Sequence, residues 1–368
     1  MAAPYDICIR GAGVVGRTLA LLLAQDRLRV GLVETPDTGA AADVRAYAIN
    51  AASKELLSQL RAWPDAATGD VTPVLRMEVQ GDEGAQVSFD ALSQGSDTLA
   101  WIAGAAALQE RLREAVRYQP GIDILSAPAP ATLTVLCEGK TSAARDDLGV
   151  HYDITRYGQH AIAARLATTL PHAQVARQWF AGGEILALLP LNGPQGHAAA
   201  LVWSVSQARA AALMALPAHE FEERLTQASQ HRLGHLTLTS DRAGWPLQLA
   251  KASRWCGPGW ALAGDTAHTV HPLAGQGLNL GLADARELAR VLHEREYWRA
   301  LGDERLLRRY ERARKAQVAT MQLATDGLQQ LFAHPAPVVG WLRQWGMRGF
   351  ERSGPLKHWA ARRAAGQL

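Results

Sequence analysis

Three glycines near the start of the chain are spaced for binding a phosphate group. Gly11, Gly13 and Gly16 form the pattern Gly-x-Gly-x-x-Gly. In this pattern the first glycine permits a tight turn, the second lets the backbone approach a pyrophosphate, and the third lets a helix pack closely on a strand. Glu34 follows the next apolar run, where a carboxylate can accept hydrogen bonds from an adenosine ribose. Because a carboxylate disfavours a ribose phosphate, these residues favour FAD or NAD over NADP.

The segments around these glycines have the patterns of a strand, a helix and a second strand. Residues 5–10 form a short apolar run of the kind found in buried parallel strands, and residues 17–24 have a helical pattern that is apolar on more than one face. A second apolar run covers residues 28–33. The helix would direct its free N–H groups and positive dipole end at the phosphates, so this context favours a dinucleotide site. The alternative is a strand-to-helix turn that merely needs glycines.

A second glycine-rich segment follows a short apolar run far downstream. The Asp265 carboxylate at the end of that run can accept hydrogen bonds from a polyol. Pro272 fixes the backbone direction, and Gly275 and Gly277 let the chain pass close to a flat ligand. A helix is predicted over residues 278–292, with its N-terminus toward that ligand. A positive dipole end there would stabilise an anionic reduced flavin.

Two histidines in the same segment invite comparison with a metal site. His268 and His271 are three residues apart, but Pro272 makes the segment a loop, and no Glu or Cys completes a ligand set. We therefore expect no metal. A place for His271 and the Pro272 backbone near a flavin ring is implied only by the family resemblance described next.

Taken together, the two segments resemble those of the FAD-dependent aromatic hydroxylases (class A flavoprotein monooxygenases), in particular the ubiquinone-biosynthesis hydroxylase branch. The resemblance is closest over residues 264–279. It also covers residues 43–50, 188–191, 245–247 and 307–312, so it extends over nearly the whole chain.

The resemblance implies a set of residues that hold FAD: Gly11, Gly13, Gly16, Glu34, Arg45, Gln109, Gly264, Asp265, Gly275, Gly277, Leu278 and Asn279. The N-terminal glycines and the glutamate would hold the ADP part, and Asp265 would bind the ribityl chain. Arg45 and Gln109 would contact the pyrophosphate and the flavin side, and residues 277–279 would meet the edge of the flavin ring. The alternatives are a solvated loop arginine for Arg45 and an ordinary exposed helix residue for Gln109.

The resemblance also implies the reaction. NAD(P)H would reduce FAD, O₂ would add to give a flavin hydroperoxide, and the distal oxygen would pass to an aromatic ring, plausibly that of a prenylated phenol. The protein would position the ring, exclude water and stabilise developing charge, and no catalytic triad is expected. Two alternatives stay open: a weakly active or non-catalytic flavin-binding subunit of a biosynthetic complex, and a flavin dehydrogenase or reductase.

Three departures from the family motivate the first alternative. Glu138 replaces the aspartate of an Asp-Gly motif that the family links to FAD and NAD(P)H binding, and a site shaped for the shorter carboxylate would need backbone adjustment. The β-meander usual in the family is deleted, since only residues 122–125 and a Pro/Ala-rich stretch stand in its place. Alanines replace the usual polar and basic residues in the segment 101–107.

Composition indicates a folded protein outside the nucleic-acid-binding classes. Of 368 residues, 48% are hydrophobic and 20% are charged, and the formal net charge is only +3. Cys8, Cys137 and Cys256 are scattered, which indicates neither a disulfide framework nor a zinc cluster and favours a reducing compartment. No apolar stretch approaches the ~20 residues of a membrane-spanning helix, and no signal peptide is recognised. We therefore expect a cytoplasmic protein.

The expected fold class is α/β with an α+β second domain. A Rossmann-like FAD-binding domain with a parallel sheet would comprise residues 1–70, 100–150 and 248–335, and a smaller, mostly antiparallel sheet domain for substrate would comprise residues 71–99 and 151–247. In the second domain we predict strands over residues 183–191, 198–205 and 233–239 and a helix over residues 218–230. Trp179, Trp203 and Trp245 fall in this domain, where they would either wall an apolar pocket or form the core of the sheet.

Residues 336–368 form a basic tail with interleaved aromatic residues. Six of its residues are Arg or Lys between positions 343 and 363, against one acid, Glu351. Such a composition suits a membrane surface, which would place the protein at the periphery of the inner membrane, or a partner protein. A solvated helix packed on the FAD domain is the alternative.

Overall fold

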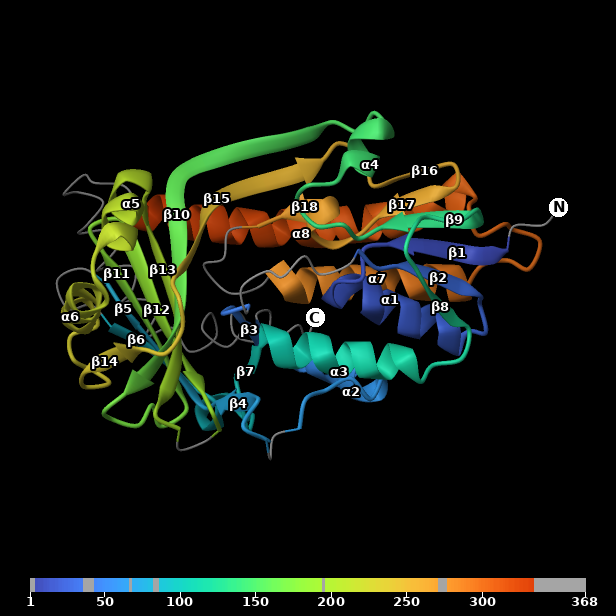
Figure 1. Ribbon diagram of the computed structural model, residues 1–368. Helices are drawn as coiled ribbons and strands as arrows, with labels where there is room; N and C mark the ends of the chain where they lie inside the picture. The colour runs from blue at the N-terminus through green and yellow to red at the C-terminus, as the bar shows by residue number, and fades with distance from the viewer. Residues whose placement is uncertain are drawn as a thin grey trace.

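The computed structural model describes residues 4–35, 43–65, 68–81, 86–193, 196–270 and 277–333, and of residues 321–333 it describes the course of the helix alone. Within these residues the strands form three sheets, and helices pack on the first two of them (Figure 1). The expected α/β fold class, with a parallel sheet and a separate antiparallel one, is confirmed.

The first sheet is parallel except at one edge. It forms the core of the half of the molecule that contains the Gly11 turn, which we call the nucleotide half. Its strands, in spatial order, are β16 (Cys256–Gly257), β17 (Trp260–Leu262), β9 (Ala131–Leu136), β1 (Tyr5–Arg10), β2 (Val30–Val33) and β8 (Ile122–Leu125). Ile7, Cys8 and Ile9 are fully buried, which explains why β1 is apolar on both faces. The chain order reverses on the two sides of β1, and ligands of such sheets bind at the carboxyl ends of the strands at that point.

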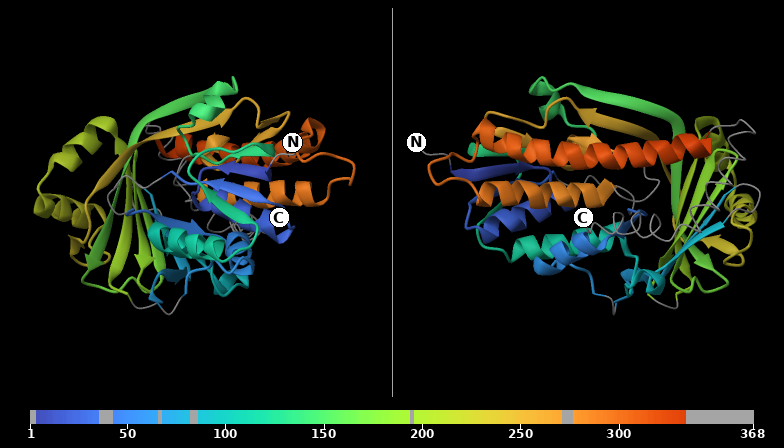
Figure 2. Two further views of the ribbon diagram at one scale, coloured as in Figure 1. Left: turned by 45° about the vertical axis from the view of Figure 1, so that its right-hand side comes forward. Right: turned by 180° about the vertical axis from the view of Figure 1, so that it is seen from behind.

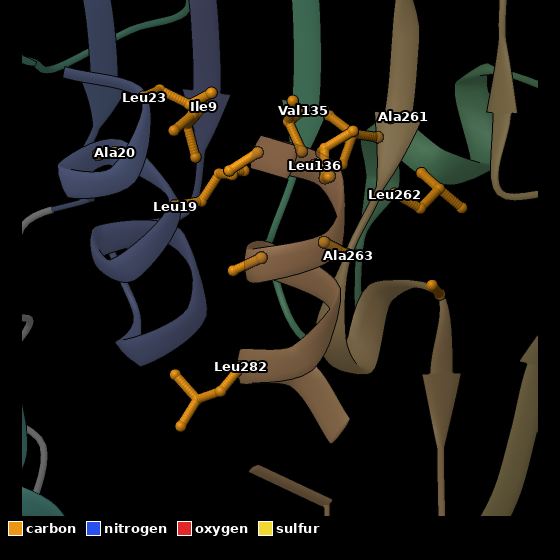
Figure 3. Packing of buried hydrophobic residues seen from close by; sticks show 14 of the residues in the cluster. Ile9, Leu19, Ala20, Leu23, Val135, Leu136, Ala261, Leu262, Ala263 and Leu282 are labelled. Atoms are coloured by element: carbon orange, nitrogen blue, oxygen red, sulfur yellow. The ribbon is translucent and has the colours of Figure 1, made fainter. Parts of the chain in front are cut away.

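Two helices from distant parts of the sequence pack side by side on this sheet. They are α1 (Val14–Gln25) and α7 (Gly277–His293), and they share one buried cluster with β1, β9 and β17. Figure 3 shows Leu19 of α1 beside Ile9 of β1, and it shows Leu282 of α7 and Leu262 of β17 in the same cluster. On the outside, α3 (Ala105–Arg117) packs against α1, and the long helix α8 (Glu304–Ala333) packs against α7 (Figure 2).

The second sheet is large and mostly antiparallel. Its strands are β18 (His268–Thr269), β15 (Ala243–Ala252), β10 (Tyr152–Thr168), β13 (Ala198–Ser206), β12 (Glu184–Leu191), β11 (Val175–Ala181), β5 (Arg76–Gln80) and β6 (Gln86–Asp90), with β14 (Leu236–Leu238) on β10. Helices α5 (Gln207–Ala215) and α6 (Ala218–Ala228) cover its outer face. A third, small sheet of β3 (Ala46–Ile49), β7 (Ala100–Gly104) and β4 (Val71–Val74) packs on the inner face. The predicted strands 183–191 and 198–205 and the helix 218–230 are confirmed, whereas the strand predicted over 233–239 is limited to β14.

Two strands join the halves directly. β10 starts beside the nucleotide half and bends into the large sheet, and β15 runs antiparallel to it across the predicted domain boundary at residue 248 (Figure 1). β4, assigned by sequence to the substrate domain, pairs with β7 of the other predicted domain. The domain boundaries stay a prediction, but the structure provides continuous backbone pairing between the two halves.

The connection from β8 to β9 is short, as the sequence indicated. Residues 126–130 join the two strands and contain no strand of their own, so the expected loss of the β-meander is confirmed.

The three tryptophans of the predicted substrate domain were expected either to wall an apolar pocket or to form the core of the sheet. Trp179 and Trp203 lie on the outer face of the large sheet in one cluster with Phe221 of α6, so the pocket interpretation is wrong for them. Trp245 pairs with Ala161 and is half-buried.

We expect Phe221→Ala to lower the free energy of unfolding by about 3–5 kcal/mol, because the ring is fully buried between α6 and the large sheet and its removal leaves a cavity. Urea unfolding followed by circular dichroism measures the change. Leu92→Ala is the control, because Leu92 is 81% exposed, and it should stay within about 0.5 kcal/mol of the parent. Equal effects of the two substitutions would contradict the packing described for α6.

Candidate cofactor site

The turn between β1 and α1 can be made only by glycines at two positions. Gly11 has φ +106°, and a Cβ atom there would lie 2.4 Å from the Cys137 carbonyl oxygen. A Cβ atom on Gly16 would lie 1.9 Å from the Gly11 carbonyl oxygen. Neither neighbour can give way, because both contacts are with backbone. These two glycines therefore serve the fold of the turn itself.

Gly13 differs from the other two glycines. It caps α1 in an extended conformation, and among the described residues no side chain hydrogen-bonds the first N–H groups of the helix. A Cβ atom on Gly13 would meet no protein atom within 4 Å. The structure thus leaves space and unused donors at the positive end of α1, which fits an anionic group such as a pyrophosphate.

Glu34 stands at the end of β2 and is held by a residue that the sequence analysis missed. Arg17 of α1 donates from Nη2 to Glu34 Oε1 at 2.5 Å, and the Arg17 side chain is buried. Burial lowers the pKa of the Arg17 guanidinium, and the charge of Glu34 acts in the opposite direction. The signal was present as an arginine directly after Gly16 in an otherwise apolar helix. The second carboxylate oxygen of Glu34 keeps acceptor capacity for a ribose.

The second glycine-rich segment lies directly against the first. β17 pairs with β9, and β9 pairs with β1, so their carboxyl ends lie at one edge of the sheet. At that edge the chain turns through the 3-10 helix η4 (Gly264–Thr266). A Cβ atom on Gly264 would be 3.3 Å from Val15 Cγ2 of α1, and one on Gly281 of α7 would be 2.7 Å from the same atom. Both glycines therefore allow η4 and α7 to approach the start of α1.

Asp265 lies in η4, and its carboxylate accepts no hydrogen bond from the residues that the structure describes. Its backbone carbonyl accepts a hydrogen bond from the Tyr152 hydroxyl at 2.8 Å. The residue is half-buried. Burial raises the pKa of Asp265, while the positive charges of Lys140 and Arg45 lower it. A half-buried carboxylate with unused acceptors fits the predicted contact with a polyol.

A buried carboxylate beneath η4 fixes this arrangement. Asp284 of α7 accepts hydrogen bonds from the Gly264 N–H at 2.9 Å, from His268 Nε2 at 2.6 Å and from Arg314 Nε of α8 at 2.6 Å. Burial alone would raise the pKa of Asp284, but the interactions with His268 and Arg314 outweigh it and lower the pKa. His268 also stacks on Trp255 with ring centroids 4.8 Å apart. The sequence analysis missed Asp284 and Arg314, because nothing local marks an acid in a helix as buried.

Three further residues that were predicted to contact FAD, Arg45, Gln109 and Asn279, differ in exposure and in hydrogen-bond partners. Arg45 is exposed and forms a bidentate ion pair with Asp43, which raises the pKa of its guanidinium. Gln109 is half-buried on α3. The Asn279 side chain donates to the Ala48 carbonyl and accepts from the Asn50 N–H, so it joins α7 to the segment between β3 and α2 (Ala51–Gln59). Its predicted contact with the flavin, and those of Arg45 and Gln109, stay predictions.

Several predicted positions cannot be placed. His271, Pro272 and Gly275 lie outside the described residues, as does the basic tail. Gly277 and Leu278 begin α7 and are partly exposed. The site is therefore built here from β1, α1, β2, η4 and α7.

Glu138 lies just beyond the end of a regular strand, and the backbone adjustment expected for it stays a prediction. β9 keeps regular parallel pairing with β1 and β17 up to Leu136. Beyond it, Glu138 Oε1 lies 2.8 Å from Arg10 Nε, and Glu138 Oε2 accepts from the Ser142 hydroxyl at 2.5 Å. Both oxygens of the longer side chain thus have partners, and Ser142 also caps α4 (Ala143–Asp147).

Residues 129–325 match the family described as FAD binding domain. The chain is also 31% identical to the 3-demethoxyubiquinol 3-hydroxylase of Escherichia coli K12, over 99% of each chain. The chain belongs to this FAD-binding family. It is 31% identical to a ubiquinone hydroxylase, UbiL, of Rhodospirillum rubrum, over 99% of this chain and 90% of that one.

Solved structures agree on the fold. A probable FAD-dependent monooxygenase of Pseudomonas aeruginosa, pqsL, superposes with a TM-score of 0.78 at 21% identity, over 94% of this chain and 99% of that one. The predicted family and the expectation of a FAD-dependent monooxygenase are thereby confirmed. FAD is the cofactor of this family, and the space at Gly13 and the unused carboxylate of Asp265 fit it.

Two glycine substitutions should separate folding from cofactor binding. We expect Gly16→Ala to unfold the nucleotide half, because the added methyl group overlaps the Gly11 carbonyl. We expect Gly13→Ala to keep the parent Tm, because its methyl group meets no protein atom, but to raise the Kd for FAD at least about tenfold. Thermal unfolding and flavin fluorescence titration measure the two effects. A folded Gly13→Ala variant with unchanged FAD affinity would place the pyrophosphate elsewhere.

Removal of the Asp284 charge should destabilise the protein and flatten its response to acid. Asp284→Asn should lower the free energy of unfolding by about 3 kcal/mol, because His268 and Arg314 then lack a negatively charged partner in a buried site. The folded-state pKa of Asp284 is lowered, so its contribution is present above the ordinary value near 3.8 and is lost as pH falls through the folded-state value. Urea unfolding at a series of pH values should therefore show a smaller loss of stability toward acid in the variant. Arg286→Gln, an exposed site on the same helix, is the control and should change little.

Proposed function

We propose that this chain is a FAD-dependent monooxygenase that hydroxylates an aromatic precursor of ubiquinone, with NAD(P)H as reductant. The observation that carries the proposal is the meeting of η4 and the glycine turn at Val15, which creates one edge for a dinucleotide. Its support lies in the full-length similarity to proteins named as ubiquinone hydroxylases in two bacteria. A mitochondrial ubiquinone biosynthesis monooxygenase, COQ6, of Drosophila melanogaster is also 29% identical over 99% of this chain.

When bound, FAD supplies the redox chemistry that activates O₂ for transfer to the ring. The protein contributes binding and orientation. The start of α1 would hold the pyrophosphate, Glu34 the adenosine ribose and Asp265 the ribityl chain. The Asp284 network would keep η4 in place while these contacts form. Such preorganised groups lower the barrier because they do not have to reorganise during the reaction.

The inner face of the large sheet is the surface that we propose for the aromatic ring. Side chains alternate along β10, so Ala161 and Ala163 share a face with Arg165, whose Nη2 donates to the Arg45 carbonyl at 2.6 Å. Across the sheet, Ser204 and Val202 lie opposite these two alanines. Small and apolar residues on the face that looks toward the cofactor half suit a flat ring that must be kept from water.

The departures from the family do not favour the weakly active alternative. Glu138 has partners for both carboxylate oxygens, and β9 is regular up to Leu136, so the altered motif is built into an ordered loop. We infer that the reductant binds beside this loop. Contact with a membrane surface or a protein complex through residues 336–368 stays part of the proposal, as does a position at the membrane periphery. None of the described helices has the length and apolarity to cross a bilayer.

The purified protein should be yellow and should consume O₂ and NADH or NADPH when a prenylated phenol is added. The product should carry one oxygen atom from labelled O₂, because a monooxygenase transfers one atom to the ring, and mass spectrometry measures it. Stopped-flow flavin reduction with each nucleotide identifies the reductant. Product oxygen from water, or flavin reduction with no hydroxylated product, would favour a dehydrogenase or reductase. A colourless protein that does not take up FAD would contradict the proposal altogether.

A further inference from the structure

Three turns lie at the edge of the first sheet where its parallel strands begin, opposite the edge proposed for the cofactor. Residues 26–29 precede β2, residues 118–121 precede β8, and residues 294–303 join α7 to α8 (Figure 1). His293 Nδ1 at the end of α7 lies 2.8 Å from Asp26 Oδ1, and α1 packs against both α7 and α3. The three turns therefore form one surface, with residues 26–29 in the middle, which we call the amino edge.

The amino edge carries three exposed aromatic side chains. Tyr118 is 72% exposed, Tyr297 is 94% exposed and Trp298 is 69% exposed, and no other Phe, Tyr or Trp in the described part of the chain is as exposed. The rings of Tyr297 and Trp298 meet edge to face, with their centroids 5.1 Å apart. Tyrosine and tryptophan combine an apolar ring with a polar tip, so they are suited to a boundary between water and an apolar phase.

The loop that carries the aromatic pair is fixed to the body of the protein. Glu296 Oε2 lies 2.9 Å from Arg299 Nε, and Glu296 Oε1 lies 2.6 Å from Arg309 Nη2 of α8. The Gly259 N–H, just before β17, donates to the Gly302 carbonyl at 2.9 Å. Binding through rings on such a fixed loop costs little conformational entropy, because few degrees of freedom are lost.

The amino edge has a surplus of positive charge. All acidic residues of the segment 294–304 are held in ion pairs with arginines. Two further acids at this edge, Asp6 and Asp123, form no ion pair with a described residue. Five arginines likewise have no carboxylate partner within the described ranges: Arg27, Arg29, Arg117, Arg295 and Arg305. Unpaired cations beside exposed rings complement a surface that is negatively charged outside and apolar beneath.

The arrangement of these residues favours a lipid surface over a protein partner. A contiguous apolar area is the usual mark of a protein-binding surface, but the aromatic residues of the amino edge do not form one. Residues 26–29, which carry Arg27 and Arg29, separate Tyr118 from the pair at 297–298. On a bilayer, rings can enter the headgroup layer at separate points while guanidinium groups meet phosphates between them.

We propose that the amino edge binds an anionic bilayer surface, with Tyr297 and Trp298 in the headgroup layer. This contact is distinct from the one proposed for residues 336–368, because it uses a fixed loop of the nucleotide half. It requires neither the cofactor nor the hydroxylation reaction. It therefore goes beyond the proposed function, and its failure would leave that function standing.

Vesicle flotation of the holoprotein tests the role of the aromatic pair. Vesicles of phosphatidylcholine mixed with an equal part of phosphatidylglycerol should bind the parent protein, and vesicles of phosphatidylcholine alone should bind it more weakly. Tyr297→Ser combined with Trp298→Ser should weaken binding to the mixed vesicles at least about tenfold, because the variant has no rings to bury. Leu92→Ser combined with Leu170→Ser is the control, since it removes two exposed apolar side chains from the other half and should change binding little.

The positive charges are tested with the same vesicles. Arg295→Gln combined with Arg305→Gln should weaken binding to the mixed vesicles about thirtyfold, as expected for two arginines near an anionic surface, and should affect binding to phosphatidylcholine alone much less. Arg224→Gln combined with Arg232→Gln removes two exposed arginines from the half that contains the large sheet, and binding should stay close to that of the parent. Equal losses in the two pairs would show a general effect of net charge and would overturn the inference.

Fluorescence quenching reports the position of the indole ring. Brominated phosphatidylcholine in the mixed vesicles should quench Trp298, and Trp298→Phe, which keeps a ring at this position, should still bind but lose most of that quenching. Each variant should keep the parent's flavin content, which shows that it is folded.

Three outcomes would contradict the proposal. The parent could bind neither kind of vesicle, or the Tyr297 and Trp298 double variant could bind as well as the parent. Alternatively, sedimentation velocity could show a dimer of the parent that this double variant lacks, with no binding to vesicles. The amino edge would then serve a second copy of the chain rather than a bilayer.

Discussion

The buried carboxylate of Asp284 is the interaction on which the cofactor edge depends. It accepts hydrogen bonds from Gly264 in η4, His268 in β18 and Arg314 in α8, so one side chain of α7 fixes three other segments. A carboxylate without water is costly unless its oxygens are paired, so these segments are restricted to the positions that pair it. The direction of the Asp265 side chain follows from this restriction, since Asp265 comes directly after Gly264.

Close backbone approach is the second constraint. Val15 at the start of α1 touches both Gly264 and Gly281, and no larger residue fits at Gly281 without moving it. Segments near the two ends of the sequence therefore form one surface at the carboxyl edge of a parallel sheet. In the binding mode that we propose, a dinucleotide along this edge would meet the positive dipole end of α1 first and Asp265 of η4 next. The shape of the FAD site that we propose therefore depends on the close packing of α1 against α7 and η4, as well as on the residues that would contact the cofactor.

Neighbouring side chains accommodate the glutamate that stands at position 138 in place of the family's aspartate. A longer carboxylate could have displaced the loop, but Arg10 at the end of β1 and Ser142 at the start of α4 both reach it. Arg10 is itself a charged, partly exposed residue at the end of an apolar strand, and its partner Glu138 lies just beyond the end of the adjacent strand β9. The two residues are therefore best understood as a pair.

The sequence by itself determined the glycine turn, the second glycine segment, and the strands and helices with a clear apolar pattern, such as β1, α1, β2 and α7, because these depend on local backbone chemistry and on hydrophobic periodicity. Only the tertiary structure decided which polar side chains serve the fold. Asn279 binds backbone of the segment before α2, and Trp203 packs under α6, although both had been considered for a ligand. The type of a residue shows which hydrogen bonds and apolar contacts its side chain can form, but the groups that form them belong to segments far away in the chain. Burial and partnership are therefore decided by packing, which no local pattern records.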